Sequence, residues 1–311
     1  MRVLCIGDND SSFYRWMGIM FPGGNCPNVA AYCRLNGHES GYIGVIAADR
    51  VGNHFLSALQ SLKVDVSRIR VCEGSTTFTD VTLNNADRVF GEYRNDIQKS
   101  NPIHLGEDDL AYIRSFDLAH SSIYSALDGN VLPRLKENGI RVSYDFSDSW
   151  TGRNIETICP NLSYAFFSCG HLDQKQTKLT LVEAVRYGAA VAVGTRGVGG
   201  AHLFDGRRFY YQRAYPADAV DTIGAGDAFI ARFLLSYEEG RKIREKCDGP
   251  HAERSAFRQE DLDENRSVLT RCAMSQAALF AAGVCQHYGP IGMGMKMDMQ
   301  LNSIDGKDAL L

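Results

Sequence analysis

Short apolar runs alternate along this chain with longer segments in which apolar residues recur at helical spacing. The runs are too short to be helices, and several are rich in Val, Ile and Phe, which favours strands. Between two of them lies a segment whose apolar residues, Leu132, Leu135 and Ile140, have the wider spacing of a helix. This alternation predicts an α/β fold built on a mostly parallel sheet. The predicted strands are 3–6, 117–123, 142–148, 165–167 and 189–195.

Polar side chains follow the first predicted strand directly. Asp8 and Asn9 come after Gly7, where the strand ends in a turn. In open α/β sheets, ligands bind at the carboxyl ends of the strands, so these side chains are candidates for a binding site. A dinucleotide-binding start would need G-x-G-x-x-G at this point, and only Gly7 is present. The pattern therefore argues against a dehydrogenase.

Other segments depart from the strand and helix alternation. Residues 76–83 alternate like a half-solvated strand, and a turn-like stretch separates them from a second strand at 88–93, which predicts a hairpin. Residues 240–270 are rich in charge and poor in apolar periodicity, so we expect a surface excursion or loop there. From 291 to 311 the chain is polar after a run of Gly and Met, and we expect a disordered tail.

Composition narrows the classes of function. The chain has 311 residues, 44% hydrophobic and 23% charged, as in ordinary globular proteins. A formal net charge of -4 argues against nucleic-acid and membrane partners. The 9 cysteines show no C-x-x-C spacing, which favours a reducing compartment. Neither a signal peptide nor an apolar stretch of about 18 residues is present, so we expect a cytoplasmic protein.

The most distinctive stretch is 221–227, Asp-Thr-Ile-Gly-Ala-Gly-Asp, followed by an apolar helix. Gly224 and Gly226 allow a sharp turn that points several backbone N–H groups at one place, where the helix dipole also favours an anion. Asp227 lies in the first turn of this helix and could take a proton from an attacking hydroxyl beside a bound phosphate. The alternative is that Asp227 only complements the helix N-terminus, as many acids in first turns do.

A second glycine turn lies near the start of the chain, at 23–30. Gly23 and Gly24 lead into an amphipathic helix that begins with Asn25 and Asn28. Bare glycine backbone and two amide side chains could contact a polyol from several directions. An ordinary helix start with Asn caps is the alternative explanation.

Taken together, the two stretches resemble the signatures of the PfkB (ribokinase-like) family of carbohydrate kinases. The chain has Gly-Gly-Asn-x-x-Asn-x-Ala at 23–30 and Asp-Thr-x-Gly-Ala-Gly-Asp at 221–227. The resemblance covers about 1–289 and implies a three-layer α/β sandwich with a mostly parallel central sheet and a small β lid. It predicts one kinase domain over 1–290, with the lid formed by about 10–24 and 73–101.

The resemblance also assigns roles to residues. Asp227 would be the catalytic base, and the backbone of Gly224, Ala225 and Gly226 the anion hole. Thr195, Gly197 and Gly200 match a Thr-x-Gly-x-x-Gly segment near the nucleotide, to which Ala278 and Gly289 would contribute. The expected sugar-binding residues are Asp8, Asn9, Gly23, Gly24, Asn25, Asn28, Arg88 and Glu92.

ATP and Mg²⁺ are the cofactors that the resemblance implies, and no Walker A motif is present. Many family members also use K⁺ near the anion hole, for which Asp221 and Thr222 are the candidate ligands. The family's Asn-x-x-Glu segment, which helps to hold Mg²⁺, is replaced by residues 168–171, Ser-Cys-Gly-His. Asp173 is the nearest acid and is a candidate for holding a Mg²⁺-bound water.

Three segments resemble the fructoselysine 6-kinase branch of the family: 7–9, 87–93 and 145–150. A fructosamine carries a protonated amine, for which Asp8, Asp10, Asp87 and Glu92 could supply acidic partners. Ser12 stands where relatives commonly have a sugar-binding Asp. The alternatives are therefore a fructokinase, a ribokinase, a 2-keto-3-deoxygluconate kinase, or a non-catalytic descendant that binds sugar or nucleotide. The edges of the lid could be free or pair across a homodimer.

Overall fold

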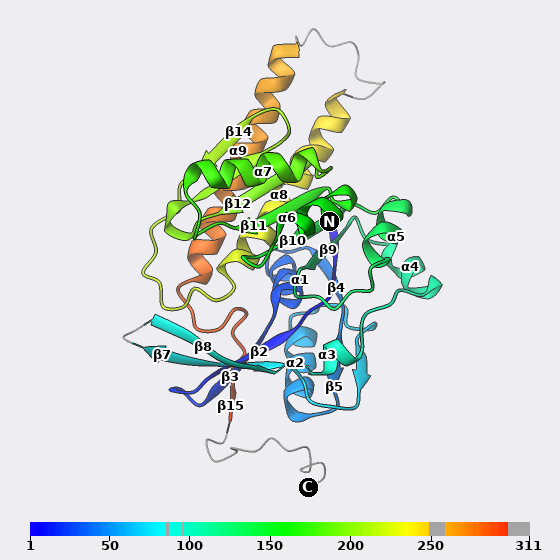
Figure 1. Cartoon of the computed structure of the whole chain (residues 1–311), viewed down its shortest axis with the longest axis vertical. Helices are drawn as coiled ribbons and strands as arrows, with labels where there is room; N and C mark the ends of the chain where they lie inside the picture. Colours follow the sequence, from blue (N-terminus) through cyan, green and yellow to red (C-terminus); the bar gives the residue numbers. More distant parts are fainter. Residues whose placement is uncertain (85–86, 95, 249–258, 298–311) are drawn as a thin grey trace.

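The computed structural model describes residues 1–84, 87–94, 96–248 and 259–297. Eight described strands form the larger sheet, in the order β14-β13-β12-β11-β10-β9-β1-β4 (Figure 1). The strands from β12 to β4 run parallel, and β13 and β14 are added antiparallel at one edge. The predicted mostly parallel sheet is thereby confirmed. The strands are β1 (Arg2–Ile6), β4 (Glu39–Ile43), β9 (Leu118–Ser122), β10 (Val142–Asp145), β11 (Tyr164–Ser168), β12 (Val191–Thr195), β13 (Ala201–Phe204) and β14 (Phe209–Gln212).

Helices cover both faces of this sheet and bury a separate apolar cluster against each. One cluster contains side chains of α1 (Asn25–Leu35), α2 (Arg50–Ser61), α8 (Ala225–Asp248) and α9 (Gln259–Val284). The other contains side chains of α3 (Asp96–Ser100), α4 (Glu107–Ile113), α5 (Val131–Glu137), α6 (Gly152–Ile158) and α7 (Gln174–Arg186). Parallel strands are apolar on both sides because both sides are covered, which explains the continuous apolar runs in the sequence. The result is a three-layer sandwich.

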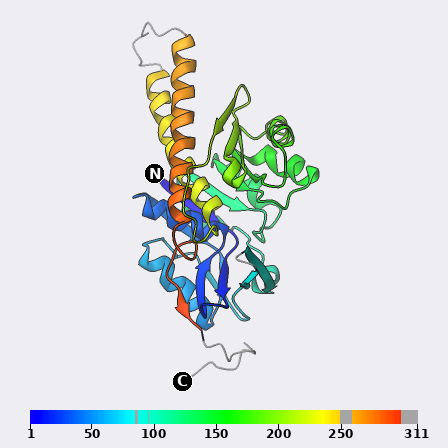
Figure 2. The same ribbon diagram turned by 90° about the vertical axis from the view of Figure 1, so that its left-hand side faces the viewer.

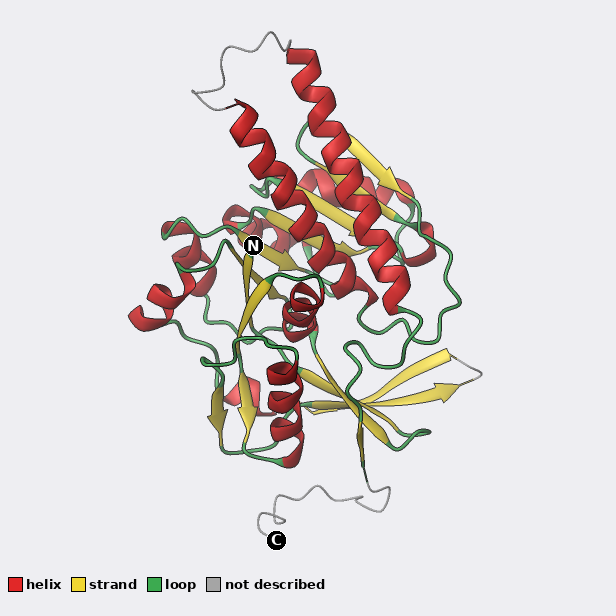
Figure 3. Cartoon of the chain, turned by 180° about the vertical axis from the view of Figure 1, so that it is seen from behind, coloured by secondary structure: helices red, strands yellow, loops and turns green. Residues whose placement is uncertain are grey.

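A smaller sheet lies beside the first, in the order β15-β3-β2-β7-β8 (Figure 3). Its strands are β2 (Asp10–Tyr14), β3 (Ile19–Gly23), β7 (Phe78–Asn84), β8 (Asp87–Arg94) and β15 (Met295–Lys296). The strands β2, β3, β7 and β8 fall within the two ranges expected for a lid, and β7 and β8 form the predicted hairpin. β2 and β3 connect β1 to α1, so this sheet is continuous with the carboxyl edge of the larger one. A third, two-stranded sheet pairs β5 (Val45–Ala47) with β6 (Arg70–Cys72).

The start of the expected disordered tail has a defined structure. Ile291 is buried, and β15 pairs antiparallel with β3 through Met295 and Lys296. The pairing places this segment along the edge of β3 and covers unpaired backbone groups there. Residues 298–311 lie outside the described part of the chain.

The charged excursion is largely helical instead of a loop. α8 extends to Asp248 and α9 begins at Gln259, and the two helices pack along each other and project beyond the sheets (Figure 2). Ion pairs one turn apart, such as Arg241 with Glu245, stabilise such solvated helices. The high charge therefore marks exposed helix faces.

Within the described chain, no helix is long and apolar enough to cross a membrane.

A buried ion pair network anchors α8 to the sheet. The carboxylate of Glu238 is fully buried and lies 2.7 Å from the guanidinium of Arg141 and 2.9 Å from that of Arg241. The hydroxyl of Tyr164, at the start of β11, donates to the same carboxylate. One acid thus holds two partly buried cations, and its removal would leave Arg141 without this partner and Arg241 with only Glu245.

We expect Glu238→Ala to lower the free energy of unfolding by roughly 3 kcal/mol, because the two arginines lose their common counter-ion. The matched control is Glu239→Ala, since Glu239 is the next residue and makes only a surface contact with His38 at 3.5 Å. This change is expected to cost less than about 1 kcal/mol. Urea unfolding of both variants measures the difference, and equal costs would contradict the role given to Glu238.

Candidate active site

The N-termini of α1 and α8 meet at two amide side chains. Asn25, the first residue of α1, donates from Nδ2 to Oδ1 of Asp227 at 2.7 Å. Asn28 donates from Nδ2 to Oδ2 of the same carboxylate, also at 2.7 Å. Two neutral donors therefore fix the orientation of the carboxylate without neutralising it. Because Asp227 is half-buried, it stays open to a ligand, and the two sequence stretches at 23–30 and 221–227 form one site.

The Asn25 amide is shared between two acids. Its Nδ2 also donates to Oδ2 of Asp145 at 2.9 Å, and Asp145 is the last residue of β10. Asp145 in turn accepts a hydrogen bond from the backbone N–H of Ser147 at 2.9 Å. A single NH₂ group therefore bridges Asp145 and Asp227, which would otherwise repel each other.

His120 fixes which way this amide points. One ring nitrogen of His120, Nε2, lies 2.9 Å from Oδ1 of Asn25, and the other, Nδ1, lies 2.9 Å from the hydroxyl of Ser143. Burial lowers the pKa of His120 to about 3, so the ring is neutral. A neutral ring carries one proton, and the amide oxygen of Asn25 can only accept. We therefore assign the proton to Nε2, which leaves Nδ1 to accept from Ser143.

The same surroundings shift the acids toward neutral pH. Burial raises the pKa of Asp227 to about 8, the Asn28 and Asn25 hydrogen bonds oppose this shift, and Asp145 and Asp8 add to it. Burial likewise raises the pKa of Asp145 to about 7, together with the negative charge of Asp8. An acid whose pKa lies near the working pH is suited to accept and return a proton. Asp227 has this property and is half-buried.

The start of α8 presents backbone donors beside this carboxylate. Gly224 has a φ of 84°, in the left-handed region that glycine tolerates, and this turn leads directly into the helix. The N–H of Ala225 bonds to the carbonyl of Thr222 at 3.2 Å, so it is already used. Among the described residues, no acceptor is found for the N–H groups of Gly224, Gly226 and Asp227. Free N–H groups at a helix N-terminus are suited to bind an anion, which agrees with the role expected for this turn.

Comparison with known proteins identifies the family. Residues 19–252 match the pfkB family of carbohydrate kinases. The chain is 34% identical over 296 residues to fructosamine kinase FrlD of Bacillus subtilis, with 94% of each chain covered. It is also 34% identical over 238 residues to fructoselysine 6-kinase of Escherichia coli, covering 76% of this chain and 90% of the relative. The chain belongs to the pfkB family. It is accordingly a phosphotransferase that acts on a sugar hydroxyl.

Solved structures support the same fold. Fructokinase of Xylella fastidiosa, with bound ATP, superimposes with a TM-score of 0.72 at 15% identity, covering 95% of both chains. The ribokinase of Arabidopsis thaliana in complex with ribose and ATP gives a TM-score of 0.66 at 17% identity, covering 90% of this chain and 95% of that one. The predicted ribokinase-like sandwich is confirmed by these matches.

Asp8 holds the start of α1 in this pfkB kinase. Its Oδ2 accepts from the N–H of Asn25 at 2.7 Å, and its Oδ1 from the hydroxyls of Ser122 and Ser125 at 2.6 and 3.1 Å. Both oxygens of this predicted sugar-binding residue are therefore engaged by protein donors, and Oδ2 positions the helix. Gly24, with a φ of 107°, packs against Asn9, where a Cβ would come within 2.6 Å of the Asn9 Cα.

Two further residues expected to bind sugar have mainly internal contacts. Asn9 is buried and donates to the Tyr42 hydroxyl and the Val45 carbonyl, although its Oδ1 has no partner among the described residues. A Cβ on Gly23 would lie 2.9 Å from Cγ of Pro290, so this glycine allows the 290 segment to approach.

The strand β8 carries the positions of Arg88 and Glu92, and their side chains lie outside the described residues.

Asp10, at the start of β2, is the most unusual acid in this region. Its Oδ2 accepts from the Thr79 hydroxyl at 2.8 Å, while its buried Oδ1 has no partner in the described chain. Burial raises the pKa of Asp10 to about 7, and the charge of Asp8 adds to this effect. A buried, unpaired carboxylate oxygen is costly to the free protein and is suited to a ligand that brings a positive charge.

The residues expected to bind the nucleotide lie on three segments. Thr195 ends β12, and Gly197 and Gly200 form the turn η2 (Gly197–Gly199) with its C-cap, both with positive φ. A Cβ on Gly200 would lie 2.3 Å from the Gln212 carbonyl oxygen, so only glycine fits there. Ala278 lies half-buried on α9. Gly289 is buried and donates its N–H to Oδ2 of Asp221 at 2.9 Å.

The candidate cation ligands are mostly engaged by protein donors. Asp221 accepts from the Tyr14 hydroxyl and from the N–H groups of Ile223 and Gly289, while Thr222 is exposed. Asp173 is the N-cap of α7 and accepts from the N–H of Gln176 at 2.7 Å. No group of three His, Cys, Asp or Glu side chains able to hold a metal is found in the described chain. The described residues therefore do not form a protein cage for Mg²⁺, and K⁺ binding stays a prediction.

Sequence reasoning missed His120 and Asp145 as site residues. Both lie at or near the carboxyl ends of neighbouring strands, β9 and β10, next to the β1 end that carries Asp8. The polar ends of these strands were the available signal. What the sequence lacks is the pairing of β10 with β9 and of β9 with β1, which brings the strand ends together.

Replacement of Asp10 tests the cost of its buried carboxylate. An unfolded Asp has a pKa near about 3.9, and folding raises that of Asp10 to about 7. The folded state thus holds the proton more tightly, and stability is lost as the pH rises from about 4 to 7. We expect Asp10→Asn to raise the free energy of unfolding by roughly 2–4 kcal/mol at pH 8 and by less at pH 5.

The control for this measurement is Glu137→Gln, which removes one negative charge from an exposed position on α5. It should leave the free energy of unfolding within about 0.5 kcal/mol of the parent at both pH values. Denaturant unfolding at pH 5 and pH 8 provides the comparison. An Asp10→Asn variant that is less stable at pH 8 would contradict the cost assigned to this carboxylate.

Proposed function

We propose that this pfkB kinase transfers the γ-phosphoryl group of ATP to a terminal hydroxyl of a fructosamine such as fructoselysine, with Asp227 as the catalytic base. The observation that carries the proposal is the placement of Asp227. Its carboxylate, with a pKa of about 8, lies at the tip of α8 beside the N–H groups that have no acceptor among the described residues. A hydroxyl and a terminal phosphate can be held together there.

The chemical step follows from this geometry. Asp227 accepts the proton of the acceptor hydroxyl as its oxygen forms a bond to the γ-phosphorus, and the bond from that phosphorus to the bridging oxygen of ADP breaks. The N–H groups of Gly226 and Asp227, with the helix dipole, stabilise the negative charge on the transferring group. Asn25 and Asn28 keep the carboxylate aimed at the hydroxyl. Mg²⁺ is expected to be held by the nucleotide phosphates and water.

Two observations favour a fructosamine over a neutral sugar. The relatives of the highest identity given above are named fructosamine kinase and fructoselysine 6-kinase. Asp10, with an unpaired carboxylate oxygen near Asp8, provides a partner for the protonated amine that a fructosamine carries and a ketose lacks. An ammonium ion beside these acids would lower the pKa of Asp10 and recover part of the cost of burying it.

Other kinase activities remain the alternatives. A fructokinase of Salmonella typhimurium is 26% identical over 242 residues, covering 69% of this chain and 76% of the relative, so a neutral ketose is the second candidate. Ser12 is buried in β2 and cannot act as the acid found there in relatives. A non-catalytic descendant would have no need for a carboxylate held by two amides at a free helix N-terminus. A measurement of turnover distinguishes a kinase from a non-catalytic descendant, and turnover with different sugars distinguishes the kinases from one another.

We expect Asp227→Asn to lower kcat by about 10³-fold or more, because the amide cannot accept the proton. Binding of ATP, measured by calorimetry, should change little, since the backbone donors remain. In the parent enzyme, kcat/KM should rise with pH up to about 8 as Asp227 loses its proton. Activity of Asp227→Asn within about tenfold of the parent would exclude Asp227 as the base.

Substrate choice is tested by comparing fructoselysine with fructose in a coupled assay of ADP release. We expect the parent enzyme to prefer fructoselysine, and Asp10→Asn to raise KM for fructoselysine by about tenfold, because the carboxylate loses its contact with the ammonium. KM for fructose should stay within about twofold, and Glu137→Gln should change neither value. A parent enzyme that prefers fructose would defeat the fructosamine assignment while leaving the kinase assignment intact.

A further inference from the structure

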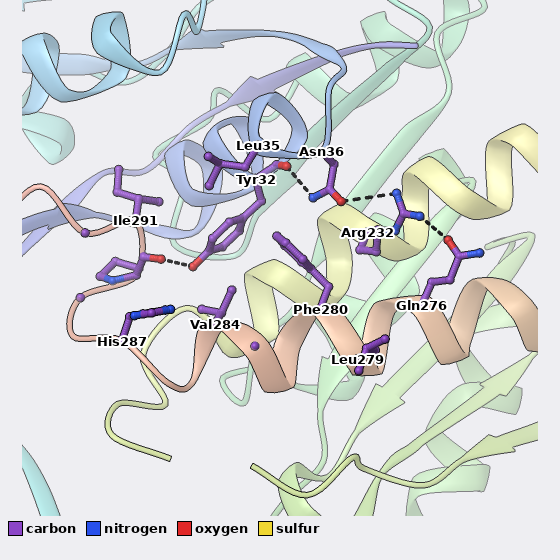
Figure 4. Close-up of a pocket in the computed structure, with 14 residues that line it drawn as sticks. Tyr32, Leu35, Asn36, Arg232, Gln276, Leu279, Phe280, Val284, His287 and Ile291 are labelled. Atoms are coloured by element: carbon purple, nitrogen blue, oxygen red, sulfur yellow. Dashed lines mark hydrogen bonds between the residues drawn. The ribbon is translucent and has the colours of Figure 1, made fainter. Parts of the chain in front are cut away.

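A cavity of about 910 Å³ lies among α1, α8, α9 and the segment that follows α9 (Figure 4). Asp227 does not line it, whereas Gly289, one of the residues expected near the nucleotide, does. Leu35 and Asn36 border it from α1, and Arg232 from α8. Its remaining walls come from α9 and from 287–292. The residues that line the cavity include Tyr32, Arg232, Gln276, Leu279, Phe280 and Pro290.

This cavity lies on the opposite side of α9 from the residue expected at the nucleotide. Successive helix residues are about 100° apart, so Gln276 and Phe280 lie roughly 160° from Ala278 around the axis. Gln276 and Phe280 line the cavity and Ala278 does not. α9 therefore presents one face to the cavity and the opposite face to the region where Ala278 is expected to meet the nucleotide, and Gly289 borders the cavity after the helix ends.

The walls of the cavity are mainly apolar. Leu35 is 56% exposed and Leu279 is 60% exposed, although leucine is normally buried. Phe280 lies between them and packs edge-on against Tyr32. Large apolar side chains gathered around a hollow are typical of a surface that binds a ligand with an apolar body.

A cation without an acidic partner lies at one end of the cavity. The half-buried guanidinium of Arg232 donates to the amide oxygens of Asn36, at 3.4 Å, and of Gln276. Both acceptors are neutral, and among the described residues no carboxylate forms an ion pair with Arg232 or lines the cavity. Arg232 is thus oriented while its charge stays uncompensated. Arginine in such a position suits a carboxylate.

The far wall of the cavity touches the phosphate-binding turn. The Tyr32 hydroxyl donates to the Pro290 carbonyl, and both residues line the cavity. A Cβ on Gly224 would lie 2.6 Å from this hydroxyl and 2.7 Å from Cβ of Pro290. A ligand that contacts Tyr32 and Pro290 would therefore restrain the turn that begins α8.

We propose that this cavity is an effector site for a small monocarboxylate with an aromatic or aliphatic body. The carboxylate binds Arg232, and the body packs on Leu279 and Phe280. Because Tyr32 and Pro290 support Gly224, binding there changes the affinity of the enzyme for ATP, and ATP changes the affinity for the effector by the same factor. This inference goes beyond the proposed function and does not depend on which sugar is phosphorylated.

The probe for the experiment is 4-phenylbutyrate, with 4-phenylbutanol as its neutral match. We expect calorimetry to show binding of 4-phenylbutyrate to the full chain, weakened at least tenfold in Arg232→Met, which keeps the apolar stem but removes the charge. Gln276→Glu, which places an acid beside Arg232, should weaken it similarly. Arg186→Met, on α7, is the matched control and should bind like the parent.

Circular dichroism and thermal unfolding show whether each variant is folded. If Arg232→Met does not fold, the binding test rests on a folded Gln276→Glu variant. Equal affinity for the acid and the alcohol, or no loss of affinity in the folded variants, would overturn the site. In the parent enzyme, saturating 4-phenylbutyrate should change KM for ATP at least twofold, with no change in Arg232→Met. Binding with KM unaltered would overturn the effector role. Failure of the proposed function affects only turnover, and the binding measurement is independent of it.

Discussion

The active site depends on keeping several acids close together with little water around them. Asp145 and Asp227 share the NH₂ group of Asn25, and the charge of Asp8 acts on both. Each ionised carboxylate is destabilised by burial and by its neighbours, so the pKa values move toward neutrality. A fold that stabilised these acids fully, with Lys or Arg for example, would lower their pKa values and leave none of them near neutrality. The neutral donors around these acids hold each carboxylate in position without neutralising its negative charge.

Sheet topology brings these residues together. Asp8 follows β1, Ser122 ends β9 and Asp145 ends β10, and these strands are neighbours in the larger sheet. Their carboxyl ends form one edge, onto which α1 begins because Asp8 accepts the N–H of Asn25. α8 packs beside α1 and adds Asp227 from the other end of the sequence. The site thus combines residues from three strands and two helices, and no short segment of the chain could form it.

Whether the sequence predicts a feature of this arrangement depends on how far apart along the chain the interacting residues lie. Glycine turns before helices and the hairpin at 76–93 are local features, and local patterns predicted them. His120 was missed because its role depends on Asn25, which lies far from it in sequence and near it only through strand pairing. The helical content of the charged segment was missed for another reason. Apolar periodicity reports only faces that are buried, and much of α8 and α9 projects into solvent.

Asp221 connects the smaller sheet to the turn that begins α8. Its carboxylate accepts from Tyr14 on β2, from Ile223 within the turn and from Gly289 after α9. Three segments that are distant in sequence therefore depend on one buried side chain. Because β2 pairs with β7, the hydrogen bond of Tyr14 connects the smaller sheet to the turn that holds Gly224. A shift of β2 relative to this turn would break the hydrogen bond from Tyr14 to Asp221, so this one acid holds the smaller sheet and the turn before α8 together.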